Sequence, residues 1–222
     1  MIKKQSSSKI LQADPLHPTH ELINEAALVI KNGGVIAFPT QHLYGLGADA
    51  FNADAVNRVF EIKRRPYDKP LLVLIDNSYD LTRLVQQVPY AATLIMERFW
   101  PGAVTIIFKA KHILPTILTA GTERIGVRMP VHPVALALTV AVQGPITATS
   151  ANITGNSGCS MVSDMDSLIT DKLDLIIDVG ALKGGTGSTV VDVTGDSPKI
   201  LRQGAVSGKD IFDAVFQKKL RS

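Results

Sequence analysis

Clusters of hydrogen-bonding and cationic side chains follow several apolar runs of this sequence, at points where strands would end. In FPTQHLYGLG, an apolar run ending at Phe38 and Pro39 leads directly to Thr40 and His42. Similar clusters stand in IGVRMP, ITATSAN, KGGTGSTVVDV and KILRQG, whose polar members are Arg128, Ser150, Asn152, Ser188 and Arg202. Ligands of open α/β sheets bind in a crevice at strand ends. We therefore expect these clusters to converge on one site.

The residue types in these clusters favour binding of polyanions and amino acids. Arginine gives a bidentate fork for carboxylate or phosphate, and lysine gives a point charge for a triphosphate. The stretch KRRPYDK adds Lys63, Arg65 and Lys69 with a single carboxylate among them. A solvated helix end would have the same composition, because cations also stabilise the C-terminus of a helix.

Common catalytic and metal-binding motifs are absent. The chain has no GxxxxGK[ST] stretch, and no GxGxxG follows the first predicted strand. Its five histidines show no HExxH or Cys-His spacing, so we expect no metal site built from protein ligands. Mg²⁺ would arrive on a nucleotide, and catalysis would depend on positioning and charge neutralisation. The sequence assigns no general base.

Composition indicates a folded domain. The chain has 222 residues, of which 45% are hydrophobic, and a formal net charge of only +3. We expect a flexible tail over residues 1–12 and one domain over 13–222. Its apolar runs are too short for a membrane helix or a signal peptide, which favours a cytoplasmic protein. The single cysteine, Cys159, excludes an internal disulfide framework.

Hydrophobic periodicity predicts alternating helices and strands. Helical spacing covers 19–31, 53–63, 79–87, 89–99, 133–142 and 209–220. Short apolar runs predict strands at 35–38, 70–75, 104–108, 125–129, 146–150, 173–178 and 188–193. This order is typical of an α/β protein, and the short connections near the C-terminus predict antiparallel members. We therefore expect a twisted, mixed parallel and antiparallel sheet flanked by helices.

Several of these stretches together resemble one known family. GGVIAFPTQHLYGLGADA, EIKRRPYDKPLLVLI, FWPGAVTIIF, IGVRMPVHP, ITATSANITG, STVVDV and ILRQGAVS occur in the order found in the YrdC-like family. The resemblance covers about residues 22–207 and is to the short, single-domain threonylcarbamoyl-AMP synthases. It implies a YrdC-like fold with a large concave basic cavity. The implied enzyme is a nucleotidyltransferase that joins L-threonine, bicarbonate or CO₂, and ATP carrying Mg²⁺.

The resemblance also implies products, partners and site residues. The products are L-threonylcarbamoyladenylate and pyrophosphate, and the adenylate passes to a tRNA threonylcarbamoyl transferase complex that modifies adenosine 37. The residues matching the L-threonine site are Thr40, His42, Arg128, Ala148 and Ser188. Those matching the ATP site are Lys63, Arg65, Lys69, Ser150, Asn152 and Arg202.

Two positions depart from the family pattern and leave alternatives open. His42 stands where many members have threonine, and Leu74 where many longer members have histidine. The imidazole could contact the threonine carboxylate, accept a proton, or only fill space. Two other functions remain: a non-catalytic module that binds structured RNA weakly by its phosphates, and a paralogue with other carbamoyl-transfer chemistry.

Overall fold

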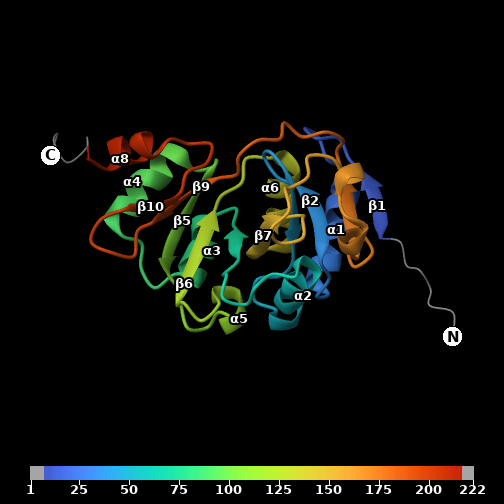
Figure 1. Cartoon of the computed structure of the whole chain (residues 1–222), viewed down its shortest axis with the longest axis horizontal. Coiled ribbons are helices and arrows are strands. Elements are labelled where there is room, and N and C mark those ends of the chain that lie inside the picture. Colours follow the sequence, from blue (N-terminus) through green and yellow to red (C-terminus); the bar gives the residue numbers. More distant parts are fainter. Residues whose placement is uncertain (1–7, 217–222) are drawn as a thin grey trace.

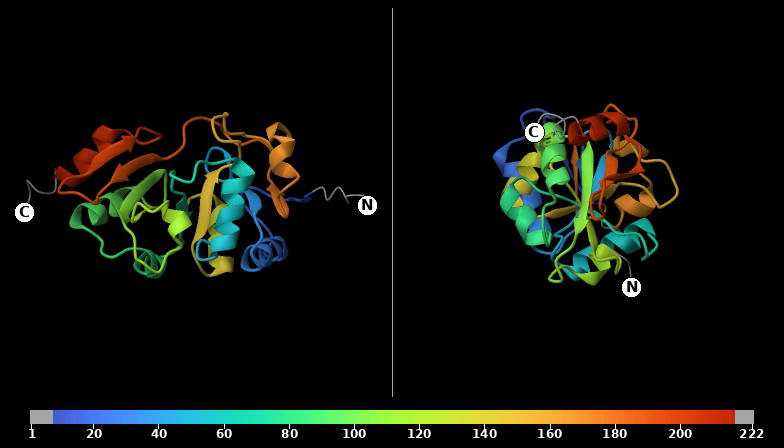
Figure 2. Two further views of the ribbon diagram at one scale, coloured as in Figure 1. Left: turned by 60° about the horizontal axis from the view of Figure 1, so that its bottom comes forward. Right: turned by 90° about the vertical axis from the view of Figure 1, so that its left-hand side faces the viewer.

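The computed structural model describes residues 8–216, which form a continuous ten-stranded sheet with helices on both faces (Figure 1). In chain order the strands are β1 (Lys9–Gln12), β2 (Ile36–Pro39), β3 (Tyr44–Gly47), β4 (Leu72–Leu74), β5 (Val104–Lys109), β6 (Arg124–Arg128), β7 (Ile146–Ser150), β8 (Leu175–Asp178), β9 (Thr189–Asp192) and β10 (Lys199–Arg202). Their order across the sheet is β1-β8-β2-β3-β7-β4-β6-β5-β9-β10. β1 and α8 therefore lie at opposite ends of the long axis (Figure 2).

The sheet is mixed, as predicted from the sequence. The parallel pairs are β1 with β8, β8 with β2, β4 with β6, and β5 with β9. The other neighbouring pairs are antiparallel. In the middle of the sheet, Leu72 is in register with both Ala148 and Gly126, and Gly126 is in register with Ile107. These four residues form one row across β7, β4, β6 and β5, on one face of the sheet.

Two helices cover part of that face. α1 (His20–Lys31) and α6 (Pro133–Val142) pack against each other and bury Ile36 and Phe38 of β2 and Ile146 of β7. The buried strand residues in this apolar cluster come from β2, β4, β7 and β8. The same face of β5, β6 and β9 contributes no buried residue to it, so this half of the face is available for a cavity.

The opposite face carries the larger apolar cluster. Its helices are α2 (Ala53–Lys63), α3 (Ser78–Leu84), α4 (Tyr90–Phe99), α5 (Thr116–Thr119), α7 (Ser167–Thr170) and α8 (Gly208–Phe216). A short 3₁₀ turn, Val162–Asp164, precedes α7. β5 and β6 place alternate residues in this cluster, such as Ile106 and Val127, because successive side chains of a strand point to opposite faces. No helix among the described residues is long and apolar enough to cross a membrane.

The N-terminal segment differs from the prediction of a flexible tail over residues 1–12. Residues 1–7 lie outside the described part of the chain, but Lys9–Gln12 form β1. β1 pairs in parallel with β8 through a four-residue register, and Leu11 packs against the apolar cluster beneath α1 and α6. Backbone pairing at the sheet edge orders this segment although its side chains are mostly exposed. The last predicted helix is α8, and residues 217–220 of that prediction also lie outside the described residues.

The Thr189 side chain fixes the turn that follows β10. The Thr189 hydroxyl oxygen accepts hydrogen bonds from the amides of Gly204 (2.9 Å) and Val206 (3.2 Å). Gly204 lies so close to the start of β9 that a Cβ atom there would be 2.3 Å from the Gly187 carbonyl oxygen. The absence of a side chain at 204 thus permits the turn to pack beside β9, next to Arg202.

We predict that Gly204→Ala lowers the free energy of unfolding by about 1–3 kcal/mol, because the new methyl group meets backbone atoms that cannot move aside. Gly195→Ala is the matched control, since a Cβ atom at 195 has no neighbour within 4 Å. Urea unfolding monitored by circular dichroism measures both variants. Equal stability of the two variants would contradict the packing described for this turn.

Candidate functional site

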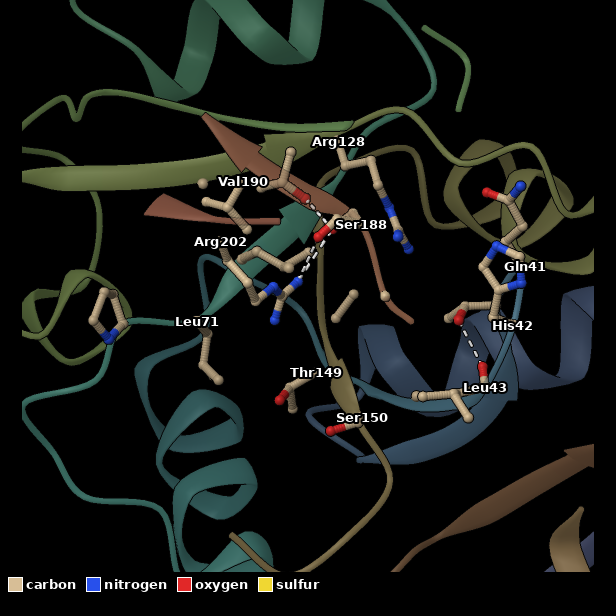
Figure 3. Close-up of a pocket in the computed structure, with 18 of the residues that line it drawn as sticks. Gln41, His42, Leu43, Leu71, Arg128, Thr149, Ser150, Ser188, Val190 and Arg202 are labelled. Atoms are coloured by element: carbon tan, nitrogen blue, oxygen red, sulfur yellow. Dashed lines mark hydrogen bonds between the residues drawn. The ribbon is translucent and has the colours of Figure 1, made fainter. Parts of the chain in front are cut away.

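A cavity of about 380 Å³ opens on the same face of the sheet, beside the apolar cluster under α1 and α6 (Figure 3). Its floor is the row of Ala148, Leu72, Gly126 and Ile107. Its sides come from segments far apart in sequence, the 40–43 loop after β2, the end of β7, and the strands β9 and β10. Each of the five polar clusters places at least one residue in the lining, so the prediction that they converge is confirmed.

Gly126 leaves space in the cavity directly above the sheet because it has no side chain. A Cβ atom on this residue would lie 3.2 Å from the Thr105 methyl carbon and 3.4 Å from the Leu72 Cβ atom. Any larger side chain would fill the space directly above the sheet. The glycine in the run IGVRM therefore has a spatial role that a buried strand alone does not require.

Arg128 is the most buried cation of the cavity. Its side chain comes from the end of β6, is 9% exposed, and points between Ser188 and the 40–43 loop (Figure 3). Its Nε atom is buried without a hydrogen-bond partner, and no carboxylate of the described residues pairs with it. Burial, and then the charge of Arg202, lower the pKa of Arg128 to about 10. It remains charged at neutral pH, so an anion in the cavity would stabilise it.

Arg202 approaches the same space from β10. One of its terminal nitrogens donates to the Ser188 carbonyl oxygen at 2.9 Å and lies 3.4 Å from the Ser188 hydroxyl. The Ser188 hydroxyl in turn lies 2.8 Å from that of Thr105. These contacts hold the second guanidinium beside Arg128 although the two charges repel each other.

The 40–43 loop forms another side of the cavity. The Thr40 hydroxyl donates to the Leu43 carbonyl oxygen at 2.6 Å, and the Thr40 amide donates to the same oxygen at 3.0 Å, so the loop is a tight turn. Gln41 Oε1 and His42 Nε2 are buried and have no partner. Buried polar atoms are normally hydrogen-bonded, so these two atoms indicate a place where a ligand or water completes the structure.

Arg65 and Lys63 diverge although they are two residues apart. α2 ends at Lys63, and Arg64 adopts a left-handed conformation (φ 49°, ψ 43°) that turns the chain. Arg65 lines the cavity and donates to the carbonyl oxygens of Lys69 (2.8 Å) and Pro70 (2.9 Å). Burial lowers its pKa, whereas the nearby Asp68 opposes this effect.

Lys63 lies beneath the cavity wall. The residue is 2% exposed. Its amino group donates hydrogen bonds to the carbonyl oxygens of Ser150 and Asn152, the latter at 2.7 Å. The Lys63 carbonyl oxygen accepts from the Thr154 amide at 2.8 Å. Burial, followed by the charge of Arg65, lowers the pKa of Lys63 to about 8. Lys63 thus holds the end of β7, at Ser150, and the turn that follows it.

Most of the predicted site residues meet in this cavity. Those lining it are Thr40, His42, Arg65, Arg128, Ala148, Ser150, Ser188 and Arg202. Three do not line it: Lys63 lies beneath its wall, Lys69 is exposed to solvent, and Asn152 donates from its side chain to backbone carbonyl oxygens. The lining residues that we did not predict include Gln41, Thr105 and Gly126. Leu74 packs in the apolar cluster instead.

The cavity lining has a strong charge imbalance. It holds three arginines and one histidine, and it contains no aspartate or glutamate. Among the described residues, no three His, Cys, Asp or Glu side chains are gathered where they could hold a metal ion. Such a lining can bind phosphate and carboxylate groups and can stabilise negative charge that moves between them.

The sequence matches one protein family and is similar to several of its named members. The Sua5/YciO/YrdC family model, described as "Telomere recombination", matches residues 28–204. Threonylcarbamoyl-AMP synthase of Pyrococcus abyssi is 38% identical, over 85% of this chain and 56% of its own length. The protein of the same name from Bacillus subtilis is 39% identical, over 89% of this chain and 58% of its own length. The chain therefore spans a little more than half of each of these relatives.

Solved structures agree with these matches. The crystal structure of P. abyssi Sua5 complexed with L-threonine aligns with a TM-score of 0.88 at 35% identity, covering 94% of this chain and 61% of that one. The crystal structure of E. coli YciO aligns with a TM-score of 0.83 at 29% identity, covering 92% of this chain and 99% of that one.

We predict that Arg128→Met raises the free energy of unfolding by about 1–3 kcal/mol, because it removes a buried charge that lacks a partner. Arg124→Met is the control, since Arg124 pairs at 3.0 Å with the largely buried Asp192, and this variant is expected to lose stability. Urea unfolding at pH 7 compares them. A loss of stability in Arg128→Met as large as in the control would show that Arg128 is a structural cation.

Lys63 gives a pH-dependent prediction. Its pKa is about 8 in the folded protein against an ordinary value of 10.5, so the unfolded chain binds more protons than the folded one between these values. The free energy of unfolding of the wild type should therefore rise with pH across this window relative to Lys63→Met. Denaturation curves of both proteins at pH 7, 8, 9 and 10 measure the difference. Parallel pH dependences would contradict the lowered pKa.

Proposed function

The chain belongs to the Sua5/YciO/YrdC family, and we propose that it synthesises L-threonylcarbamoyladenylate from L-threonine, bicarbonate or CO₂, and ATP, with release of pyrophosphate. The observation that carries this proposal is the cavity itself, which has three arginines and no carboxylate in its lining. Two of the substrates bring negative groups, L-threonine a carboxylate and ATP a triphosphate. Relatives named threonylcarbamoyl-AMP synthase, at 38% and 39% identity, support it further.

The amino acid occupies the side of the cavity between β6 and the 40–43 loop. Arg128 pairs with its carboxylate, because a guanidinium fork matches two carboxylate oxygens. Thr40, Ala148 and Ser188 surround it, the first two lining the wall and floor and the last offering a hydroxyl. His42 completes the amino-acid site, and its unpartnered Nε2 atom is a contact for the substrate.

The nucleotide lies towards β10 and the end of β7. Arg65 and Arg202 neutralise its phosphate oxygens, and Ser150 adds a hydroxyl. Lys69 lies outside the lining as an exposed cation, and it attracts the triphosphate by charge. Lys63 and Asn152 act through the turn that presents Ser150 rather than by direct contact.

This arrangement suits a reaction in which charge shifts between bound oxygens. The amine of threonine joins the carbon of CO₂ or of a bicarbonate-derived species, and one oxygen of the resulting carbamate attacks the α-phosphate. Pyrophosphate leaves with the negative charge, which the arginines stabilise without rearranging. Mg²⁺ enters with ATP as part of the substrate. The adenylate then passes to a tRNA threonylcarbamoyl transferase complex that modifies adenosine 37.

We predict that purified protein given ATP, Mg²⁺, L-threonine and bicarbonate releases pyrophosphate, and that omission of threonine abolishes the release. Arg65→Ala should lower kcat/KM for ATP by about tenfold or more, because it removes a charge-assisted contact. Arg64→Asn is the matched control. It removes the neighbouring exposed cation, and asparagine tolerates the left-handed backbone found there.

Pyrophosphate release that does not depend on threonine would overturn the synthase proposal. Retention of structured RNA with a steep loss of affinity in salt, without any turnover, would instead support the RNA-binding alternative. Full activity of Arg65→Ala would overturn the placement of the phosphates.

A further inference from the structure

Thr105 is a polar residue at a position where β5 could have carried an apolar one. It is 1% exposed, and its neighbours along the strand, Val104 and Ile106, are fully buried in the main apolar cluster. Its side chain lies on the opposite face of β5 and lines the cavity. Its hydroxyl lies 2.8 Å from the Ser188 hydroxyl.

The distances around Ser188 do not determine which hydroxyl of the Thr105–Ser188 pair donates the hydrogen bond. The Ser188 hydroxyl oxygen can accept two hydrogen bonds and donate one. Arg202 donates to it at 3.4 Å, and either hydroxyl of the Thr105–Ser188 pair can be the donor to the other. If Thr105 donates, both acceptor sites of Ser188 are used, and its proton remains for a ligand. If Ser188 donates, it presents only an acceptor to the cavity.

The charge of the cavity decides between the two directions. Arg128 and Arg202 both face this space, and no carboxylate lines it, so the expected ligand oxygens are negative. A negatively charged oxygen accepts a hydrogen bond from a donor and is repelled by the lone pair of another acceptor. The arrangement with Thr105 as the donor is therefore the one that an anionic ligand stabilises.

We propose that Thr105 is a positioning residue: it donates to Ser188 and so directs the Ser188 proton towards the carboxylate of the bound amino acid. This inference rests on the proposed function, which supplies L-threonine as the ligand. Thr105 does not touch the substrate in this account. It acts by fixing the direction in which the Ser188 hydroxyl donates its proton, which the contact with Arg202 alone does not determine.

The position of Thr105 also separates effects on the two substrates. Arg202 is held mainly by the Ser188 carbonyl oxygen at 2.9 Å, a contact that does not involve the Thr105 hydroxyl. Loss of that hydroxyl therefore changes the Ser188 side chain and leaves the Arg202 anchor in place. The affinity for threonine should fall, and the KM for ATP should change little.

Thr105→Val and Thr105→Ser test the proposal together. Valine keeps the shape of threonine and removes the hydroxyl, whereas serine keeps the hydroxyl and removes the methyl group. We expect Thr105→Val to raise the KM and the calorimetric Kd for L-threonine about three- to tenfold, with kcat nearly unchanged, because one hydrogen bond that orients the site is lost. Thr105→Ser should keep the wild-type values.

A purely structural role for Thr105 predicts the reverse order. Packing alone would make Thr105→Ser the damaged variant, because it loses a buried methyl group, and would leave threonine affinity intact in Thr105→Val. Urea unfolding of both variants provides the stability order. The proposal is supported if Thr105→Ser is the less stable variant and Thr105→Val is the one that binds threonine more weakly.

A double-mutant cycle with Ser188→Ala completes the test. If Thr105 acts through Ser188, Thr105→Val should have no further effect on threonine affinity once the Ser188 hydroxyl is absent. Additive effects, or an unchanged Kd in Thr105→Val, would overturn the proposal while the wild type still releases pyrophosphate with threonine. A wild type that neither binds threonine nor releases pyrophosphate would instead overturn the proposed function, and this inference with it.

Discussion

Two guanidinium groups, that of the buried Arg128 and that of the more exposed Arg202, share a cavity whose lining contains no carboxylate, and the remaining structure accommodates this unneutralised charge. Arg128 and Arg202 approach the same space from β6 and β10, and the charge of Arg202 disfavours that of Arg128. Such a pair lowers the stability of a fold unless other parts of it offset the cost. The two apolar clusters on the faces of the sheet supply that stability, and they leave the cavity side of β5, β6 and β9 free of core packing. In the proposed function, this positive charge is in place before any ligand binds.

The sequence predicts the type of fold and most of the site, because both depend on patterns that are local. Polar clusters after apolar runs identified six residues that line the cavity, the basic stretch KRRPYDK identified Arg65, and the family resemblance identified Ala148. The helix over 53–63 was also correct to its ends, because Asn52 caps it by accepting from the Ala55 amide at 3.1 Å. The predicted helix over 79–87 ends earlier, at Leu84, because Val85 is extended and pairs with Ala110. Pairing with a distant strand is not visible in helical periodicity.

What the sequence could not predict depends on register. Thr105 and Gly126 stand inside the runs VTIIF and IGVRM, which are typical of strands buried on both faces. Only the alignment of Gly126 with Leu72 and Ile107 shows that one face forms a cavity floor. The basic stretch at the end of α2 also depends on backbone geometry that the sequence pattern does not show. The left-handed turn at Arg64 sends Arg65 into the cavity and leaves Lys63 beneath its wall, so cations two residues apart have different tasks.

We propose that Arg128 and Arg202 together bind anions in the cavity. Thermal unfolding in increasing concentrations of inorganic pyrophosphate, at constant ionic strength, tests it most directly, because a ligand that binds only the folded state raises the Tm. We expect the Tm of the wild type to rise with the pyrophosphate concentration and that of the double variant Arg128→Gln, Arg202→Gln to stay constant. An equal rise in both proteins, or none in the wild type, would contradict it.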